Sequence, residues 1–240
     1  MTNTSERGGP IGAPLPEGWT APPRPVRAIM EGQRVRLEPL VVAHAESLHA
    51  ANLVDRDGRN WDYLPYGPFD TLSAYQDWVG SMTRDGDPMF YAVVRQDDGR
   101  AVCVASLMRI NPAAGSIEVG HINFSPLLQR KPGATEAMYL MMKWAFEAGY
   151  RRYEWKCNAL NEPSRKAALR LGLSYEGVFR QATISKGRNR DTAWYAAIDS
   201  EWPALRAAFE TWLEPANFDA EGRQKQSLSA LTRPVLVSIG

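Results

Sequence analysis

Residues 117–157 restrict the possible folds of this chain more than any other segment. A strand-like run, Ile117–Phe124, leads into a basic loop, and apolar residues at helical spacing then predict a helix over Pro132–Ala148. A second strand-like run, Tyr153–Cys157, follows the helix. Because a helix that connects two strands allows them to lie parallel in one sheet, we expect a parallel pair here.

The other elements favour antiparallel pairing around that pair. The runs Met89–Arg95 and Ala101–Ile110 flank an Asp-Gly turn, which is a strong hairpin signal. Ser174–Ser185 and Thr192–Ile198 flank a second turn. Further expected elements are a strand at Gln33–Leu37 and helices at Val41–Asn52, Asp70–Arg84 with Asp70 as N-cap, Pro163–Leu171 and Glu201–Leu213. This order predicts an α+β sandwich with a mixed, mostly antiparallel sheet.

The composition indicates a folded domain and argues against two classes of partner. Hydrophobic residues make up 44% and charged residues 23% of the chain, which is typical of globular proteins. Because 28 Lys and Arg oppose 27 Asp and Glu, we expect no nucleic-acid or membrane partner. Cys103 and Cys157 lie in no metal-binding pattern, so we expect buried thiols and no metal. The lack of a leader-like or membrane-spanning run predicts a cytoplasmic protein.

We expect one domain with an extension at each end. Residues 1–28 form a Pro- and Gly-rich arm, in which Trp19 is a candidate docking residue. Residues 29–214 form the domain, and residues 215–240 form a tail. The apolar run Val235–Ile239 in the tail needs cover, either as an added strand or in a homodimer.

The loop between the predicted strand and the central helix is a candidate phosphate site. Free N–H groups and the positive helix end converge at such a point. Arg130 and Lys131 add two cations, and Pro132 suits the first helical position, where its missing N–H costs nothing. A solvated basic helix cap is the alternative interpretation.

Two motifs, in the order in which the family has them, resemble the GCN5-related N-acetyltransferase (GNAT) superfamily. Within that superfamily they resemble the branch of ribosomal-protein N-terminal acetyltransferases (RimJ/RimL-like). Gln129–Ala134 resembles the family's Gln/Arg-x-x-Gly-x-Gly/Ala loop, with Pro132 in place of the first glycine. Asn161–Leu173 resembles its Asn-x-x-Ser helix, which ends in Leu-Gly-aromatic. Ile117–His121 is similar to the family's strand before the cofactor loop, and Gly187–Asp191 is similar to its last hairpin. The resemblance implies a three-layer α/β/α GNAT fold.

The resemblance also implies acetyl-CoA as co-substrate and assigns residues to it. Backbone N–H groups of the loop would hold the pyrophosphate, Asn161 would hold the pantetheine arm, and Ser164 would lie near the thioester sulfur as proton donor. Helix capping is the alternative role for Asn161. The implied cofactor residues are Phe124, Gln129, Arg130, Lys131, Gly133, Ala134, Thr135, Asn161 and Ser164.

Acetyl transfer to an amine also needs a base, and two residues of one strand are candidates. Glu118 and His121 would point to opposite faces of a regular strand unless a bulge re-aims one of them. A structural ion pair for Glu118 and a core position for His121 are the alternatives. Ala168 stands where many family members have a tyrosine, and Thr183 stands where the RimJ/RimL-like branch has a glutamate, so the catalytic groups stay open.

The acceptor cleft is expected between the first two helices and the last hairpin. Trp61, Asp62, Tyr63 and Tyr66 could clasp an amine through cation–π contact and charge, although a packed surface loop is the alternative. The cluster of Lys186, Arg188 and Arg190 is interpreted as a solvated face that could meet an acidic substrate.

The sequence therefore predicts an acetyl-CoA-dependent N-acetyltransferase. The acceptor is expected to be a small-molecule amine or a peptide N-terminus that attacks directly in a ternary complex. Two alternatives stay open: a catalytically silent acyl-CoA-binding module, and a transferase for a longer donor such as succinyl-CoA.

Overall fold

An eight-stranded sheet forms the centre of the computed structural model, which describes residues 3–4, 7 and 9–240. The strand order is β3-β4-β5-β6-β7-β8-β10-β9. The pair β7–β8 is parallel and every other neighbouring pair is antiparallel, as the sequence predicts. The strands are β3 (Met30–Glu31), β4 (Val35–Pro39), β5 (Met89–Arg95), β6 (Ala101–Asn111), β7 (Ser116–Phe124), β8 (Arg152–Asn158), β9 (Ser174–Ser185) and β10 (Arg188–Ile198).

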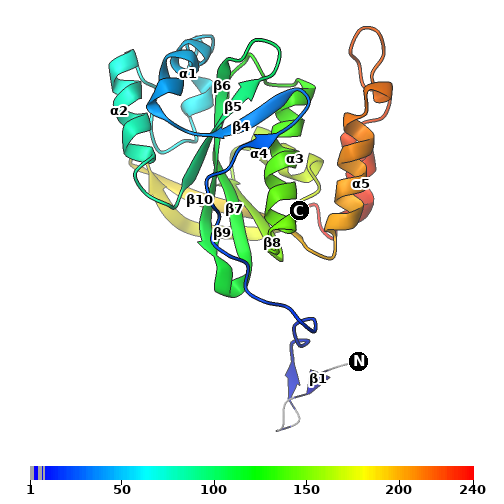
Figure 1. Ribbon diagram of the computed structural model, residues 1–240. Helices are drawn as coiled ribbons and strands as arrows, with labels where there is room; N and C mark the ends of the chain where they lie inside the picture. Colours follow the sequence, from blue (N-terminus) through cyan, green and yellow to red (C-terminus); the bar gives the residue numbers. More distant parts are fainter. Residues whose placement is uncertain (1–2, 5–6, 8) are drawn as a thin grey trace.

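Helices cover both faces of the sheet, which confirms the three-layer α/β/α sandwich (Figure 1). The helices α1 (Ala45–Asn52) and α2 (Leu72–Met82) pack on one face. The opposite face carries α3 (Pro132–Glu147) and α4 (Glu162–Arg170). The helix α5 (Trp202–Leu213) packs beside α3, and the short α6 (Leu228–Thr232) packs on α5. The sheet therefore separates two hydrophobic cores, with α3, α4 and α5 over the larger one.

The parallel strands β7 and β8 stay paired over only part of their length. Their ladder runs from Ser116 opposite Arg152 to Val119 opposite Trp155. On the other side of β7, His121 and Ile122 together oppose a single residue of β6, which is a β-bulge. His121 accordingly has a left-handed backbone with φ of +50°. Beyond Trp155 the two strands therefore diverge within the described chain.

The start of α2 differs from the prediction by one residue. Thr71, not Asp70, is the N-cap, and its Oγ1 accepts a hydrogen bond from the N–H of Ala74 at 3.2 Å. Both residue types cap helices well, so the sequence alone does not distinguish them. The first helix also starts later than expected, because residues Val42–His44 form a 3₁₀ turn ahead of α1.

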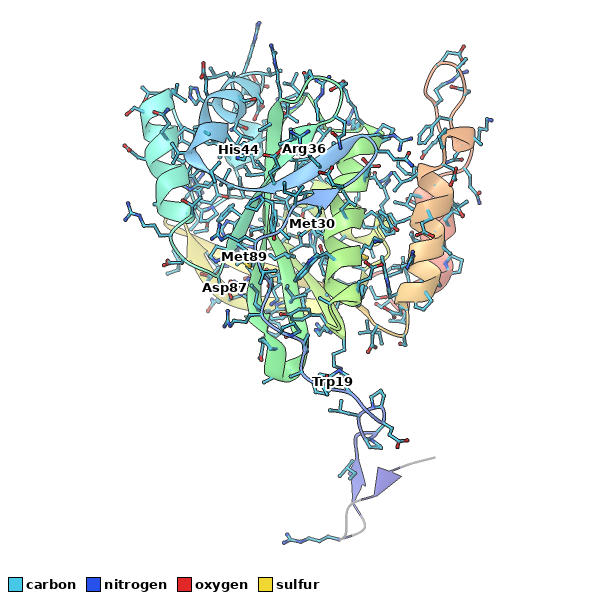
Figure 2. The ribbon with its side chains drawn as sticks, viewed as in Figure 1. Trp19, Met30, Arg36, His44, Asp87 and Met89 are labelled. Carbon is cyan, nitrogen blue, oxygen red and sulfur yellow. The ribbon has the colours of Figure 1, made fainter. Side chains whose placement is uncertain are left out.

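Both terminal extensions contact the domain. Trp19 lies at the edge of the body (Figure 2), where its ring approaches Gly115. The Pro23 carbonyl oxygen accepts a hydrogen bond from the Tyr150 hydroxyl at 3.1 Å. The tail is not separate from the domain, as its fully buried Leu228 shows.

The apolar run Val235–Ile239 adds no strand among the described residues. It lies along the start of β9, where the N–H of Tyr175 donates to the Ser238 carbonyl oxygen at 3.0 Å. Part of the run stays exposed, since Val237 keeps 80% of its surface accessible. None of the helices in the described chain has the length and hydrophobicity needed to cross a membrane.

Candidate active site

The donor loop, residues 125–133, joins β7 to α3. The Ser125 carbonyl oxygen accepts hydrogen bonds from two loop N–H groups at 3.0 and 3.1 Å, which closes the turn. Arg130 has a left-handed backbone with φ of +60°, an uncommon conformation for a residue with a side chain. Lys131 is the N-cap of α3 and Pro132 is its first residue. The positive end of the helix therefore opens next to two exposed cations.

The N–H groups of the donor loop are free at some positions and occupied at others. The N–H of Lys131 donates to the Leu128 carbonyl oxygen at 3.2 Å, and that of Ala134 donates to the Lys131 carbonyl oxygen at 3.0 Å. The tight first turn thus occupies two donors that the sequence assigns to phosphate. Within the described residues, the N–H groups of Arg130 and Gly133 have no acceptor.

Side chains in the first turn of α3 face the protein interior. A side chain at Gly133 would lie 3.1 Å from both Leu128 and Val35, so this position packs closely against β4. Thr135 is buried, and its Oγ1 accepts a hydrogen bond from Arg170 on α4 at 3.0 Å. The helix start is therefore held firmly by packing, and it can offer a ligand backbone groups rather than these side chains.

The side chain of Gln129 closes the loop instead of extending into solvent. Its Nε2 donates to the Phe124 carbonyl oxygen at 2.6 Å and to Asn60 Oδ1 at 2.8 Å. Asn60 Nδ2 donates to the same Phe124 carbonyl oxygen at 3.0 Å. Gln129 and Phe124 therefore tie the donor loop to the loop that precedes α2.

Ser164 lies beside the point where β7 and β8 separate. Its Oγ accepts a hydrogen bond from Trp155 Nε1 at 3.0 Å, and Trp155 belongs to the last residue pair of the β7–β8 ladder. The Ser164 hydroxyl also reaches Cys157, a thiol whose pKa is raised chiefly by burial. Asn161 is the N-cap of α4, and its Oδ1 accepts the Ser164 N–H at 3.1 Å. Capping thus occupies this oxygen and fixes Ser164.

The bulge in β7 turns His121 toward the face that carries α1 and α2. Its ring lies 4.9 Å from the Phe90 ring and stacks on the Tyr66 ring at 5.6 Å between centroids. His121 Nδ1 and the Tyr66 hydroxyl are 3.2 Å apart. Burial, with the charges of Arg109 and Arg190, lowers the pKa of His121 to about 4. The imidazole is therefore neutral near pH 7.

Glu118 lies on the same face as His121 but is fully engaged. Arg109 Nη1 donates to its Oε1 at 2.6 Å, and Lys156 Nζ lies 2.8 Å from its Oε2. The carboxylate is buried and has a cation on each oxygen. This geometry favours the structural ion pair over a free base, because a proton could reach Glu118 only after one of these contacts breaks.

The loop at residues 60–69 is partly buried in the core and partly exposed along the expected acceptor cleft. Trp61 is buried beneath Gly67 and Phe69, so it cannot meet a substrate, contrary to the expectation. An aromatic side chain in a loop rich in aromatic residues can face the core or the solvent, and only packing decides which. Asp62 is exposed, and the Tyr63 hydroxyl donates to the Leu160 carbonyl oxygen at 3.2 Å.

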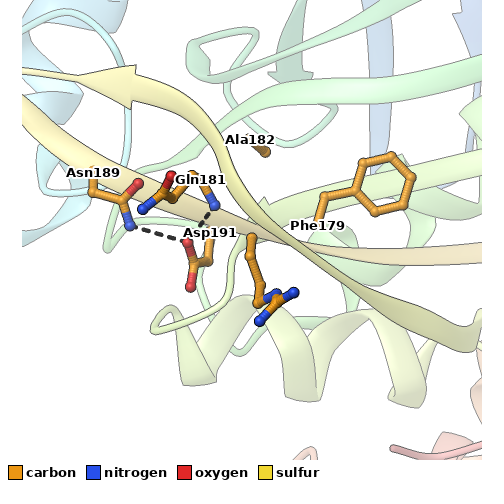
Figure 3. Close-up of a pocket in the computed structure, with 6 residues that line it drawn as sticks. Phe179, Gln181, Ala182, Asn189 and Asp191 are labelled. Carbon is orange, nitrogen blue, oxygen red and sulfur yellow. Dashed lines mark hydrogen bonds between the residues drawn. The ribbon is translucent and has the colours of Figure 1, made fainter.

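The last hairpin is tied to this loop by a residue expected to be solvated. Lys186 Nζ donates to the carbonyl oxygens of Trp61 at 2.8 Å and of Gly67 at 3.1 Å. The hairpin itself forms an open groove of about 740 Å³, shown in Figure 3. Within it, Asp191 accepts hydrogen bonds from the Gln181 N–H at 2.7 Å and from Asn189 Nδ2 at 3.0 Å. The groove lining consists of Phe179, Arg180, Gln181, Ala182, Asn189 and Asp191.

These features fit a thioester donor with a diphosphate group. Free N–H groups meet two cations at a helix start, and neither the Arg130 nor the Lys131 side chain has an ion pair among the described residues. A hydroxyl and a neutral imidazole flank the nearby divergence of the parallel strands. The fold and the site together define the class of CoA-dependent acyltransferases.

Comparison with known proteins identifies the family. The acetyltransferase (GNAT) domain family matches residues 34–174. A crystal structure of a GCN5-related N-acetyltransferase from Brucella melitensis is 45% identical, with a TM-score of 0.88 over 90% of this chain and 99% of that chain. An uncharacterized N-acetyltransferase, YnaD, from Bacillus subtilis (strain 168) is 27% identical over 61% of this chain and 84% of its own. The chain belongs to the GNAT family, and it is an acetyltransferase.

A more distant structure shares the fold and has been solved with a ligand. The RimL ribosomal L7/L12 alpha-N-protein acetyltransferase, in complex with coenzyme A, is 21% identical, with a TM-score of 0.60 over 72% of this chain and 99% of that chain. At this identity the likeness concerns the fold.

The contact between Trp155 and Ser164 was not predicted from the sequence. A signal was present, because Trp155 and Cys157 alternate on one strand and therefore share a face, just ahead of the helix that carries Ser164. Asn60 and Arg109 gave no such signal, since their partners are distant in sequence.

Proposed function

We propose that the protein transfers the acetyl group of acetyl-CoA directly to a primary amine, with Ser164 as the proton donor. The observation that carries this proposal is the hydrogen bond from Trp155 Nε1 to Ser164 Oγ at the divergence of β7 and β8. A hydroxyl that accepts from the indole keeps its own proton free to donate. The indole thus fixes the position of the hydroxyl oxygen beside the divergence of the two strands.

The donor would be held by the start of α3. The free N–H groups of Arg130 and Gly133 and the two loop cations suit the pyrophosphate. Acetyl-CoA supplies an acyl group activated as a thioester. Thr135, Gln129 and Phe124 support this binding by fixing the loop and the helix.

His121 would assist the incoming amine where β7 and β8 separate, on the sheet face opposite to Ser164. Its ring is neutral because burial lowers its pKa to about 4, and within the described chain its Nε2 has no partner. Tyr66 fixes the ring through Nδ1, which leaves Nε2 for the incoming amine. A base with so low a pKa takes up a proton weakly near pH 7, so His121 suits accepting a hydrogen bond from the neutral amine and orienting it, while water takes the proton.

The acceptor class includes small amines and peptide N-termini. The name of the RimL relative favours a protein N-terminus. The loop at residues 60–69 favours a small amine, because Lys186 ties it to the last hairpin.

Acetyl-CoA is an intracellular metabolite, so the proposal implies a cytoplasmic enzyme. A homodimer that covers Val237 and Ile239 stays part of the proposal, and light scattering after gel filtration would test it.

Two measurements test the proposed function. Calorimetric titration with acetyl-CoA, CoA and succinyl-CoA should show saturable binding, and a thiol-release assay with an amine panel should show turnover with acetyl-CoA. Binding without turnover for any amine would support the silent acyl-CoA-binding module. Faster turnover with succinyl-CoA than with acetyl-CoA would identify a transferase for the longer donor.

A further inference from the structure

A row of paired charges crosses the sheet face that carries Glu118. Its contacts have N···O distances of 2.5 to 2.8 Å, and the charges alternate in sign from β6 through β7 to β8, then along β8 and on to β9. The row consists of Arg109, Glu118, Lys156, Glu154, Arg152 and Glu176. Every charge in this row has a partner, which is the usual condition for charges of low exposure.

Arg190 lacks such a partner among the residues that the structure describes. Its Nε is buried without an acceptor, and within the described chain its guanidinium has no ion pair. The residue opposite it in the β9–β10 ladder is Thr183, which carries no charge. An unpaired guanidinium of low exposure is costly, and burial lowers the pKa of Arg190 accordingly. Such a cost suggests that an anion from outside the chain completes the site.

The surroundings of Arg190 place that anion at the acceptor side. Its charge acts on His121 and Cys157, which flank the opening between β7 and β8. Glu118 is the nearby carboxylate that acts on Arg190, but both of its oxygens are occupied by Arg109 and Lys156. The neighbouring Asp191 is engaged by Gln181 and Asn189. The structure therefore leaves the guanidinium to a ligand.

We propose that Arg190 binds a carboxylate of the acceptor, which makes the acceptor an amine that carries a carboxylate close to it, such as a free α-amino acid. This inference rests on the proposed function. A planar guanidinium matches a carboxylate with two parallel hydrogen bonds and so fixes the amine beside it. In the reaction the ammonium first loses one proton to water, the amine nitrogen bonds to the acetyl carbon and the carbon–sulfur bond breaks. The nitrogen then loses a second proton, and the departing thiolate gains one. The carboxylate stays unchanged.

The test compares amino acids with their α-amides as acceptors. The pairs are methionine with methioninamide and phenylalanine with phenylalaninamide, and the readout is kcat/KM by thiol release. We expect the acid to be preferred at least about tenfold, which corresponds to one charge-assisted contact. Intrinsic reactivity would favour the α-amides, because their amino group has the lower pKa and is more often neutral. A preference for the acids therefore has to come from the enzyme.

The variant Arg190→Gln should remove this preference. We expect kcat/KM for the acids to fall at least about tenfold while the amides keep theirs. Acetyl-CoA affinity by calorimetry should stay at the parent value, and the melting temperature should not fall, since an unpaired charge is removed. Arg188→Gln, a matched change at an exposed position of the same strand, should alter none of these values.

Different failures have different meanings. Equal turnover of acids and amides by the parent would overturn the carboxylate site and leave the acetyltransferase proposal intact. An equal loss for acids and amides in Arg190→Gln would also overturn it, because Arg190 would then act on the acyl group. Acetyl-CoA binding with no turnover of any amine would overturn the proposed function itself.

Discussion

The donor side takes its groups from consecutive residues, 125–133, whereas the acceptor side draws on segments far apart in sequence. In the donor loop, local hydrogen bonds and a helix start present two N–H groups and two cations. On the acceptor side, His121 stacks on Tyr66, and Lys186 holds the loop at residues 60–69 from the other end of the chain. The donor side therefore depends on backbone geometry, and the acceptor side depends on long-range packing.

This difference predicts that the two sides respond separately to substitution. A change in the donor loop should alter acetyl-CoA affinity without changing acceptor selectivity. A change in the acceptor segments should do the opposite. Ser164 lies where the sides meet, so its loss should affect turnover rather than either binding step.

The largest expected effect is that of Ser164→Ala on kcat. Removal of a proton donor should lower kcat roughly a hundredfold, while the acetyl-CoA affinity and the acceptor KM change little. Steady-state kinetics together with calorimetry would measure the three quantities. An equal loss of kcat and of acetyl-CoA affinity would show that Ser164 binds the donor instead.

Trp155→Phe is the matched variant for this prediction. It keeps a ring in the core and removes the N–H that Ser164 accepts. We expect kcat to fall in the same direction but by less, about fivefold, which corresponds to one hydrogen bond.

The next largest effect separates ligand binding from folding in the donor loop. Arg130→Gly removes a cation at a position with a left-handed backbone, where glycine is unstrained. Acetyl-CoA affinity should fall about tenfold, the value of one charge-assisted contact. The free energy of unfolding should change by less than about 1 kcal/mol, because relief of backbone strain offsets the entropy cost of glycine.

Calorimetry and chemical denaturation would measure these two quantities. Arg130→Lys keeps the charge and serves as the control, which should bind acetyl-CoA nearly as well as the parent. Unchanged affinity in Arg130→Gly would remove this cation from the donor site.

A smaller effect concerns pH and the buried imidazole on the acceptor side. The pKa of His121 is lowered from 6.5 to about 4, mainly by burial, so the unfolded chain binds more protons between these two values. The contribution of this group to stability is thus full above pH 6.5 and declines as the pH falls toward 4. We expect a loss of about 1 kcal/mol over that window, reduced from the full shift because the ring is partly exposed.

Thermal melting at a series of pH values would measure this loss. His121→Gln should show a shallower decline than the parent, since the other titrating groups are common to both. Parallel declines would mean that His121 titrates normally and is more exposed to water than its packing indicates.

The smallest expected effect tests the tether between the hairpin and the loop. Lys186→Met removes both hydrogen bonds to the carbonyl oxygens of Trp61 and Gly67 but keeps the apolar stem. The acceptor KM should rise about threefold, with acetyl-CoA affinity unchanged. Lys166→Met, an exposed change on α4, is the control. A change in acetyl-CoA affinity would contradict the separation of the two sides.

The sequence by itself determined the order of the elements and the donor loop. Strand and helix periodicities are local properties, and so are the loop cations and the helix start, so consecutive residues were enough to predict them. The crossover at residues 117–157 predicted the parallel pair that the sheet contains.

Only the tertiary structure decided how the acceptor side is assembled. It turned His121 by a bulge, buried Trp61, paired Glu118 with two cations and left Arg190 without an ion pair among the described residues. Each of these outcomes depends on contacts between residues distant in the chain. A side chain's burial and charge partners are properties of the packed fold, and no spacing along the sequence specifies them.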